Sequence, residues 1–198
     1  MRFQRTLPAA LLGAALVFSA CGSSSSSSAA KASSTTAVSK DFNDNDVSFA
    51  QGMIPHHQQA VGMASEALTN ASDAQVKDLA TRIKAAQGPE IAQMTSWLTT
   101  WGKPAKADAA TGSMGHESSA SGRMMTDAEM TSLGKLTGAA FDKAFLNMMI
   151  RHHQGAVAMA TTEQTNGKNQ NAKDLAARII KTQNIEITEM TATAKRLA

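Results

Sequence analysis

Two adjacent histidines lie between two methionines in the stretch MIPHHQQAVGMA, and the same arrangement returns 96 residues later as MIRHHQGAVAMA. These stretches hold four of the five histidines of the 198-residue chain. Imidazole with thioether is a soft to borderline donor set, which favours copper, above all Cu(I), and leaves zinc or iron as alternatives. The sequence therefore predicts a metal site drawn from eight residues: Met53, His56, His57, Met63, Met149, His152, His153 and Met159.

The spacing within each stretch limits what one helix could do alone. Side chains of neighbouring helical residues point about 100° apart, so His56 and His57 cannot easily grip one ion together. Met53 lies three and four residues before them, on their side of the helix, and Met148 lies four residues before His152. Each stretch is therefore expected to need donors from another helix.

The other stretch is the expected source of those donors. In a bundle whose helices alternate up and down, the first and third helices are diagonal and parallel, which would bring both histidine pairs to one height. Small side chains four residues apart on both helices, Ala60 and Ala64, then Ala156 and Ala160, would permit a close approach. The sequence leaves open whether the two stretches share one site or form two.

Acidic residues near the histidines have two interpretations each. Glu90 and Glu186 fall on the inner stripe of the helices that follow, where each could bind the ion or accept a hydrogen bond from the second nitrogen of an imidazole. Asp46 and Asp142 could cap helices or support a metal-bound histidine. The segment between the repeats adds four soft donors that could capture an ion: Met114, His116, Met124 and Met125.

The chain repeats itself from Asp46 onward at a constant offset of 96 residues, which also relates KDLATRI to KDLAARI. Each repeat shows helical periodicity in two segments, separated in the first repeat by the turn-forming stretch TNASDA. We predict an all-α four-helix bundle made of two duplicated helical hairpins. Repeat one is expected to span residues 41–101, the crossover 102–126 and repeat two 127–198.

Residues 1–20 have the pattern of an export signal: two arginines, an apolar run too short for a comfortable membrane span, and small residues before Cys21. FSAC resembles a bacterial lipobox, which predicts cleavage before Cys21 and lipidation of its thiol, with a free thiol as the alternative. The Ser-rich residues 21–40 would form a flexible tether, and the protein would be exported and anchored on the extracytoplasmic side of a bacterial membrane.

The charge of the chain does not indicate that it binds nucleic acid. Removal of the signal takes away two arginines and leaves a net charge of about +1, without a basic cluster. A metal ion and a membrane are therefore the expected partners, and the sequence names no protein partner.

The histidine helix and the segment after it resemble the domain-of-unknown-function family 305. The shared pattern is Asp, Phe, Met-x-x-His-His, Ala and Met-Ala, followed by Leu-Ala, Ile, Gln, Glu-Ile and Met, and it occurs twice over residues 41–198. The resemblance implies an exported, ferritin-like four-helix bundle, linked in some members to copper binding or copper tolerance. It also implies that the motif positions of the two stretches, from Met53 to Met63 and from Met149 to Met159, are the site residues.

Three functions compete on this sequence. The leading hypothesis is an extracytoplasmic, membrane-tethered protein that buffers, sequesters or hands on copper. A lipoprotein whose histidines sense pH or support envelope interactions without metal is the second, because histidine titrates near neutrality. A di-iron ferritin-like oxidoreductase is the third; it requires a Glu-x-x-His phrase, which the sequence lacks.

Overall fold

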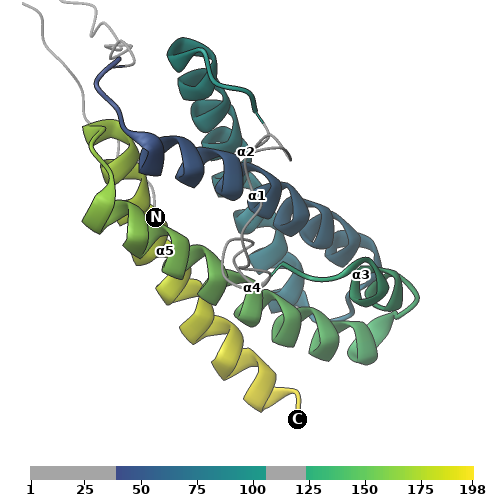
Figure 1. Cartoon of the computed structure of the whole chain (residues 1–198). Helices are drawn as coiled ribbons and strands as arrows, with labels where there is room; N and C mark the ends of the chain where they lie inside the picture. Colours follow the sequence, from purple (N-terminus) through teal and green to yellow (C-terminus); the bar gives the residue numbers. More distant parts are fainter. Residues whose placement is uncertain (1–38, 106–123) are drawn as a thin grey trace, which may run out of the picture. The chain divides into compact units, whose positions relative to one another are not determined.

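The computed structural model describes residues 39–105 and 124–198, and this part of the chain is all helix and loop (Figure 1). The signal, Cys21, most of the tether, Met114 and His116 lie outside the described residues. The helices, in chain order, are α1 (Asp44–Asn70), α2 (Ala74–Trp101), α3 (Asp127–Gly134), α4 (Gly138–Asn166) and α5 (Gln170–Arg196).

Local capping residues set the ends of the first hairpin. The Asn43 side chain accepts hydrogen bonds from backbone N–H groups at the start of α1. The Asp46 carboxylate in turn accepts from the Asn43 N–H, and the two contacts make a capping box. Asp73 caps α2 in the predicted break, so that prediction is confirmed. The residue that caps the end of α2 is Gly102, whose φ of 65° is a left-handed conformation that glycine adopts without strain.

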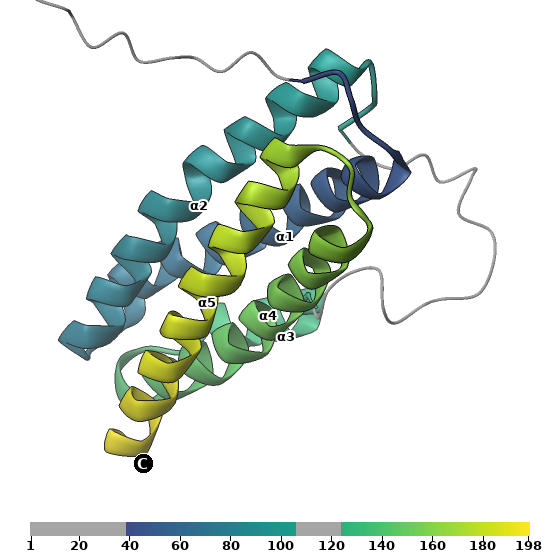
Figure 2. The same cartoon turned by 90° about the vertical axis from the view of Figure 1, so that its left-hand side faces the viewer.

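The four long helices pack in a ring in which every neighbour is antiparallel. α1 with α2 and α4 with α5 form the two hairpins, and α1 packs along α4 (Figure 2). The start of α1 meets the loop after α4, because Asp46 accepts from the backbone N–H of Lys168 and Asn169. The start of α4 likewise meets the loop after α1, through Asp142.

This arrangement corrects the expected direction of the helices. α1 and α4 are adjacent and antiparallel, not diagonal and parallel, so the order is up, down, down, up. The crossover must then connect opposite ends of the bundle, which is the ferritin-like connection with one long crossover. The two histidine pairs still meet, because each lies near the middle of its helix.

A fifth helix was not predicted. α3 occupies the first eight residues assigned to repeat two, and it buries Leu133 against α1 and α4. Its capping box joins Thr126 and Glu129. This T-x-x-E phrase is a local sign of a helix start, and it could have identified α3 from the sequence.

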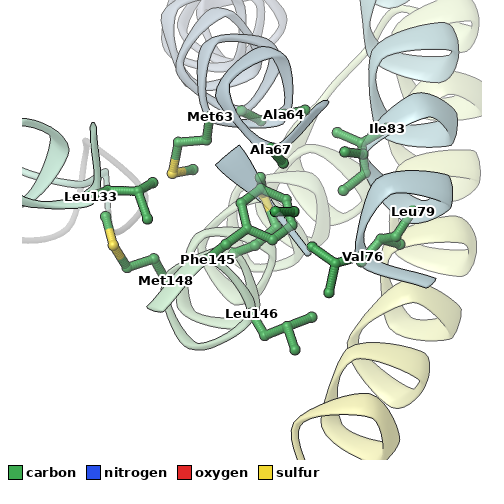
Figure 3. Close-up of a cluster of buried hydrophobic side chains, with 14 of the residues drawn as sticks. Met63, Ala64, Ala67, Val76, Leu79, Ile83, Leu133, Phe145, Leu146 and Met148 are labelled. Atoms are coloured by element: carbon green, nitrogen blue, oxygen red, sulfur yellow. The ribbon is translucent and has the colours of Figure 1, made fainter. Parts of the chain in front are cut away.

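The hydrophobic core has two clusters, one towards each end of the bundle. Figure 3 shows the first cluster, in which Met63 of α1, Val76 of α2, Leu133 of α3 and Phe145 of α4 take part. The second cluster contains the tryptophans at the end of α2. None of the described helices is long and apolar enough to cross a membrane.

Candidate metal centre

A layer of polar side chains separates the two hydrophobic clusters at mid-height. Along α1 the second cluster ends at Ile54 and the first begins at Ala60, whereas along α4 the first ends at Met149 and the second begins at Ala156. The same break occurs in α2 and α5. The central layer, as we call it, comprises eight side chains: His56, His57, Gln87, Glu90, His152, His153, Gln183 and Glu186.

The centre of the layer is a contact between the two histidine stretches. The rings of His56 and His152 lie with their centroids 3.6 Å apart and their planes tilted by 36°. Both helices carry fully buried alanines after their histidine pair, at Ala60 and Ala64 on α1 and at Ala156 and Ala160 on α4. All four histidine side chains of the layer are at most 1% exposed. The predicted meeting of the two stretches is therefore present.

The other two histidines of the layer, His57 and His153, are each held by a glutamate from the second helix of the same hairpin. Nε2 of His57 lies 2.8 Å from Oε2 of Glu90, and Nε2 of His153 lies 2.8 Å from Oε2 of Glu186. The two pairs are related by the 96-residue offset. Of the two interpretations of these glutamates, the structure shows the hydrogen bond to an imidazole.

Burial keeps the imidazole of His152, on α4, neutral. Removal from water, and then the positive charges that His56, His153 and His57 would carry, lower the pKa of His152 far below its usual value. A neutral imidazole has a lone pair on one nitrogen, which is the form that binds a metal ion. The ring nitrogens of His152 are buried without a hydrogen bond of good geometry among the described residues.

The methionines flank the layer within the hydrophobic clusters. Met53, one turn before the histidines of α1, belongs to the second cluster, and Met149, in the equivalent place on α4, belongs to the first. Met63 is fully buried in the first cluster, whereas Met159 is only partly buried against the second. Met148 lies in the first cluster and lines a pocket beside α3.

The two aspartates lie at the ends of the bundle and hold loops. Asp142 accepts from the backbone N–H of Ser72 and Asp73 and from the Ser72 hydroxyl, at 3.0–3.1 Å for the amides and 2.5 Å for the hydroxyl. Asp46 has the equivalent role at the loop after α4. Asp46 also belongs to the capping box of α1, whereas no side chain caps the start of α4, so Asp142 binds the loop without capping its helix.

Sequence reasoning gave no role to Gln87 and Gln183, which stand three residues before the two glutamates. Both are 3% exposed, and their side-chain oxygens have no hydrogen-bond partner in residues 39–105 and 124–198. The sequence signal that could have placed them in the layer is their position on the same helical stripe as Glu90 and Glu186.

The geometry limits which donors can surround one ion. In the part of the chain that is described, no group of three or more His, Cys, Asp or Glu side chains is arranged to hold a metal. An ion with three or more protein ligands would therefore need sulfur or another donor, or a movement of side chains. Imidazoles with methionine one turn away fit a soft ion such as Cu(I).

The described part of the chain is thus a two-hairpin helical bundle with a buried histidine layer. The chain belongs to the family described as "Domain of unknown function (DUF305)", whose model matches residues 46–194. The family and the all-α helical class that the sequence predicted are thus confirmed.

Three solved structures illustrate the likeness. A DUF305 protein from Streptomyces coelicolor, described as a candidate secreted protein, is 32% identical, with a TM-score of 0.70 over 77% of this chain and 93% of that one. A DUF305 fragment from Deinococcus radiodurans is 31% identical, with a TM-score of 0.69 over 79% and 99%. CopM in its Cu(I)-bound form is 32% identical, with a TM-score of 0.64 over 76% and 96%. No curated protein matches the chain significantly.

Proposed function

We propose that this protein binds copper outside the cytoplasm, through the histidines of the central layer and neighbouring methionine sulfur, and buffers, sequesters or hands on the ion. The observation that carries the proposal is the gathering of four buried imidazoles from α1 and α4 in one layer. Buried polar rings cost stability, and apolar side chains would hold the helices together better. A binding role accounts for their presence.

The likeness to CopM supports this choice of ion. CopM has been solved with Cu(I), with Cu(II) and with silver. Cu(I) and silver are soft ions that accept thioether and imidazole donors. The same donor types flank and fill the central layer of this chain.

A metal titration tests the proposal. The mature chain, residues 21–198, would carry Cys21→Ser so that a free thiol does not bind the ion, and it would be titrated anaerobically with Cu(I) and separately with Cu(II), Zn(II) and Fe(II). We expect tight Cu(I) binding that is weakened in His56→Ala/His57→Ala and in His152→Ala/His153→Ala, and lost when the pairs are combined. Equal binding by the parent and the quadruple variant would overturn the copper proposal. Oxygen turnover by the iron-loaded protein would favour the oxidoreductase alternative instead.

The proposal includes a lipid anchor at Cys21, supported by the lipobox-like FSAC and the Ser-rich segment that follows it. In a bacterial host, the full chain should fractionate with membranes. Cys21→Ser should move it to the soluble extracytoplasmic fraction. A membrane-bound Cys21→Ser variant would show that the thiol is not the anchor.

A further inference from the structure

The histidine–glutamate pairs of the central layer determine which ring nitrogen carries hydrogen. An ionised carboxylate can only accept a hydrogen bond, so the nitrogen that faces Glu90 or Glu186 must be the donor. That nitrogen is Nε2 in both His57 and His153. In the neutral ring, the lone pair is then on Nδ1.

Both Nδ1 atoms are buried and lack a hydrogen-bond partner among the described residues. A buried acceptor without a partner costs free energy, so natural proteins rarely keep one without a use for it. Here the same atom is left in both repeats, 96 residues apart. Both repeats of the duplicated sequence therefore keep an unpartnered nitrogen at the same ring position.

The geometry points to Nδ1 of His57 and of His153 as copper-binding atoms, with Glu90 and Glu186 as positioning residues that hold each ring through Nε2. This inference rests on the proposed function and specifies its atoms. Binding through Nε2 would instead require each ring to give up a 2.8 Å bond to a carboxylate. A hydrogen bond from the second ring nitrogen to a carboxylate also makes the binding nitrogen more basic.

The two positioning residues differ in their access to water. The Glu90 side chain is 21% exposed, whereas that of Glu186 is 7% exposed. Water can partly replace a lost carboxylate at the more exposed pair. The loss of Glu186 should therefore weaken binding more than the loss of Glu90.

Nitrogen NMR of the histidine rings tests the assignment. The probe is Ag(I), a diamagnetic soft ion, added as silver nitrate to ¹⁵N-labelled mature chain carrying Cys21→Ser. Without silver, the neutral rings of His57 and His153 should be the Nε2–H tautomer. With silver, the resonances of their Nδ1 atoms should move while Nε2 remains protonated. An Nδ1–H tautomer without silver, or loss of the Nε2 proton when silver binds, would overturn the assignment.

Single variants test the positioning role. Glu186→Ala should allow His153 to exchange tautomers, leave His57 unchanged and weaken Ag(I) binding about 10-fold or more. Glu90→Ala should do the reverse with a smaller loss, and Glu186→Gln, whose carbonyl can still accept from Nε2, should recover part of the affinity. Glu189→Ala, a change on the same helix at a half-buried glutamate that contacts none of the histidines of the central layer, is the matched control. Unchanged tautomers in both Ala variants would show that the glutamates do not position the rings.

The experiment separates failure of the inference from failure of the proposed function. If silver changes histidine resonances but removes the Nε2 proton, the layer binds metal and only the Nδ1 assignment is wrong. If silver moves no histidine resonance of the layer, the proposed histidine site itself is wrong, and the Nδ1 assignment is lost with it.

Discussion

Glu163 is a buried carboxyl residue that lies outside the central layer. It is 1% exposed near the end of α4, where burial and the neighbouring Asp46 raise its pKa to about 9, against a smaller lowering by Lys173 of α5. Asp46 already accepts from three backbone N–H groups, at Asn43 and in the loop after α4. Glu163 therefore keeps its proton at neutral pH.

This proton should make stability depend on pH. The folded state keeps the proton until about pH 9, whereas the unfolded chain releases it near the ordinary glutamate pKa of 4.5, so stability falls as pH rises between these values. Glu163→Gln, which is permanently neutral, should gain on the parent by at most about 1.4 kcal/mol per pH unit in that window. Urea unfolding at pH 5, 7 and 9 measures the difference. A gap between the two proteins that stays constant with pH would contradict the prediction.

At the scale of residues, a contact could be predicted from the sequence where its residues occur in both repeats. His57 with Glu90 and His153 with Glu186 could be predicted, because both occur twice at one spacing on helical stripes. Glu163 could not, because its equivalent in repeat one is Ala67 and its partner is distant in sequence. The ring nitrogen that meets each glutamate depends on side-chain packing, which spacing does not specify.

The interhelical loops are held by aspartates from the opposite repeat. Asp142→Ala would leave the backbone N–H of Ser72 and of Asp73 without their buried acceptor, so the free energy of unfolding should fall by about 3 kcal/mol. Urea unfolding of the variant measures the loss. Asp78→Ala is the control, because that side chain is 68% exposed and its ion pair with Arg82 should contribute less than about 1 kcal/mol. Equal losses in the two variants would show that the loop contacts contribute little.

The central layer should cost the bundle stability. Replacing one partner, as in Glu186→Leu, leaves the Nε2–H of His153 buried without its acceptor and should destabilise the protein by about 1–3 kcal/mol. The double variant His153→Leu/Glu186→Leu removes donor and acceptor together, and it should be at least as stable as the parent. Thermal unfolding of the metal-free proteins compares them. A double variant less stable than Glu186→Leu would mean that the layer supports the fold.

At the scale of elements, the ends of the helices were more predictable than their directions. The break between α1 and α2 could be predicted because Asp73 caps a helix locally. The direction of α4 relative to α1 could not, because a long crossover can connect either end of the bundle. The error did not separate the histidines, since residues at the middle of a helix stay at mid-height in both directions.

The association of the two hairpins should not depend on the crossover. α1 packs along α4, and ion pairs such as Arg196 with Asp73 and Arg82 with Glu189 join α5 to α2. A protease site inserted among residues 106–123 and then cleaved should give two fragments that still elute together in size-exclusion chromatography. Their circular dichroism should match that of the uncut chain. Separation of the fragments without denaturant would show that the covalent connection is required.

Each repeat supplies the aspartate that binds the interhelical loop of the other repeat, and this has a consequence for a chain with only one such repeat. A single hairpin would carry an aspartate with no loop to bind and a loop with no aspartate, so it would be incomplete as a monomer. In a symmetric dimer, the aspartate of each copy could bind the loop of the other through a self-complementary, isologous contact. The residues equivalent to His56 and His152 would then meet on the two-fold axis. A chain of half this length should therefore be an obligate homodimer, and in this protein the second repeat takes the place of the second subunit.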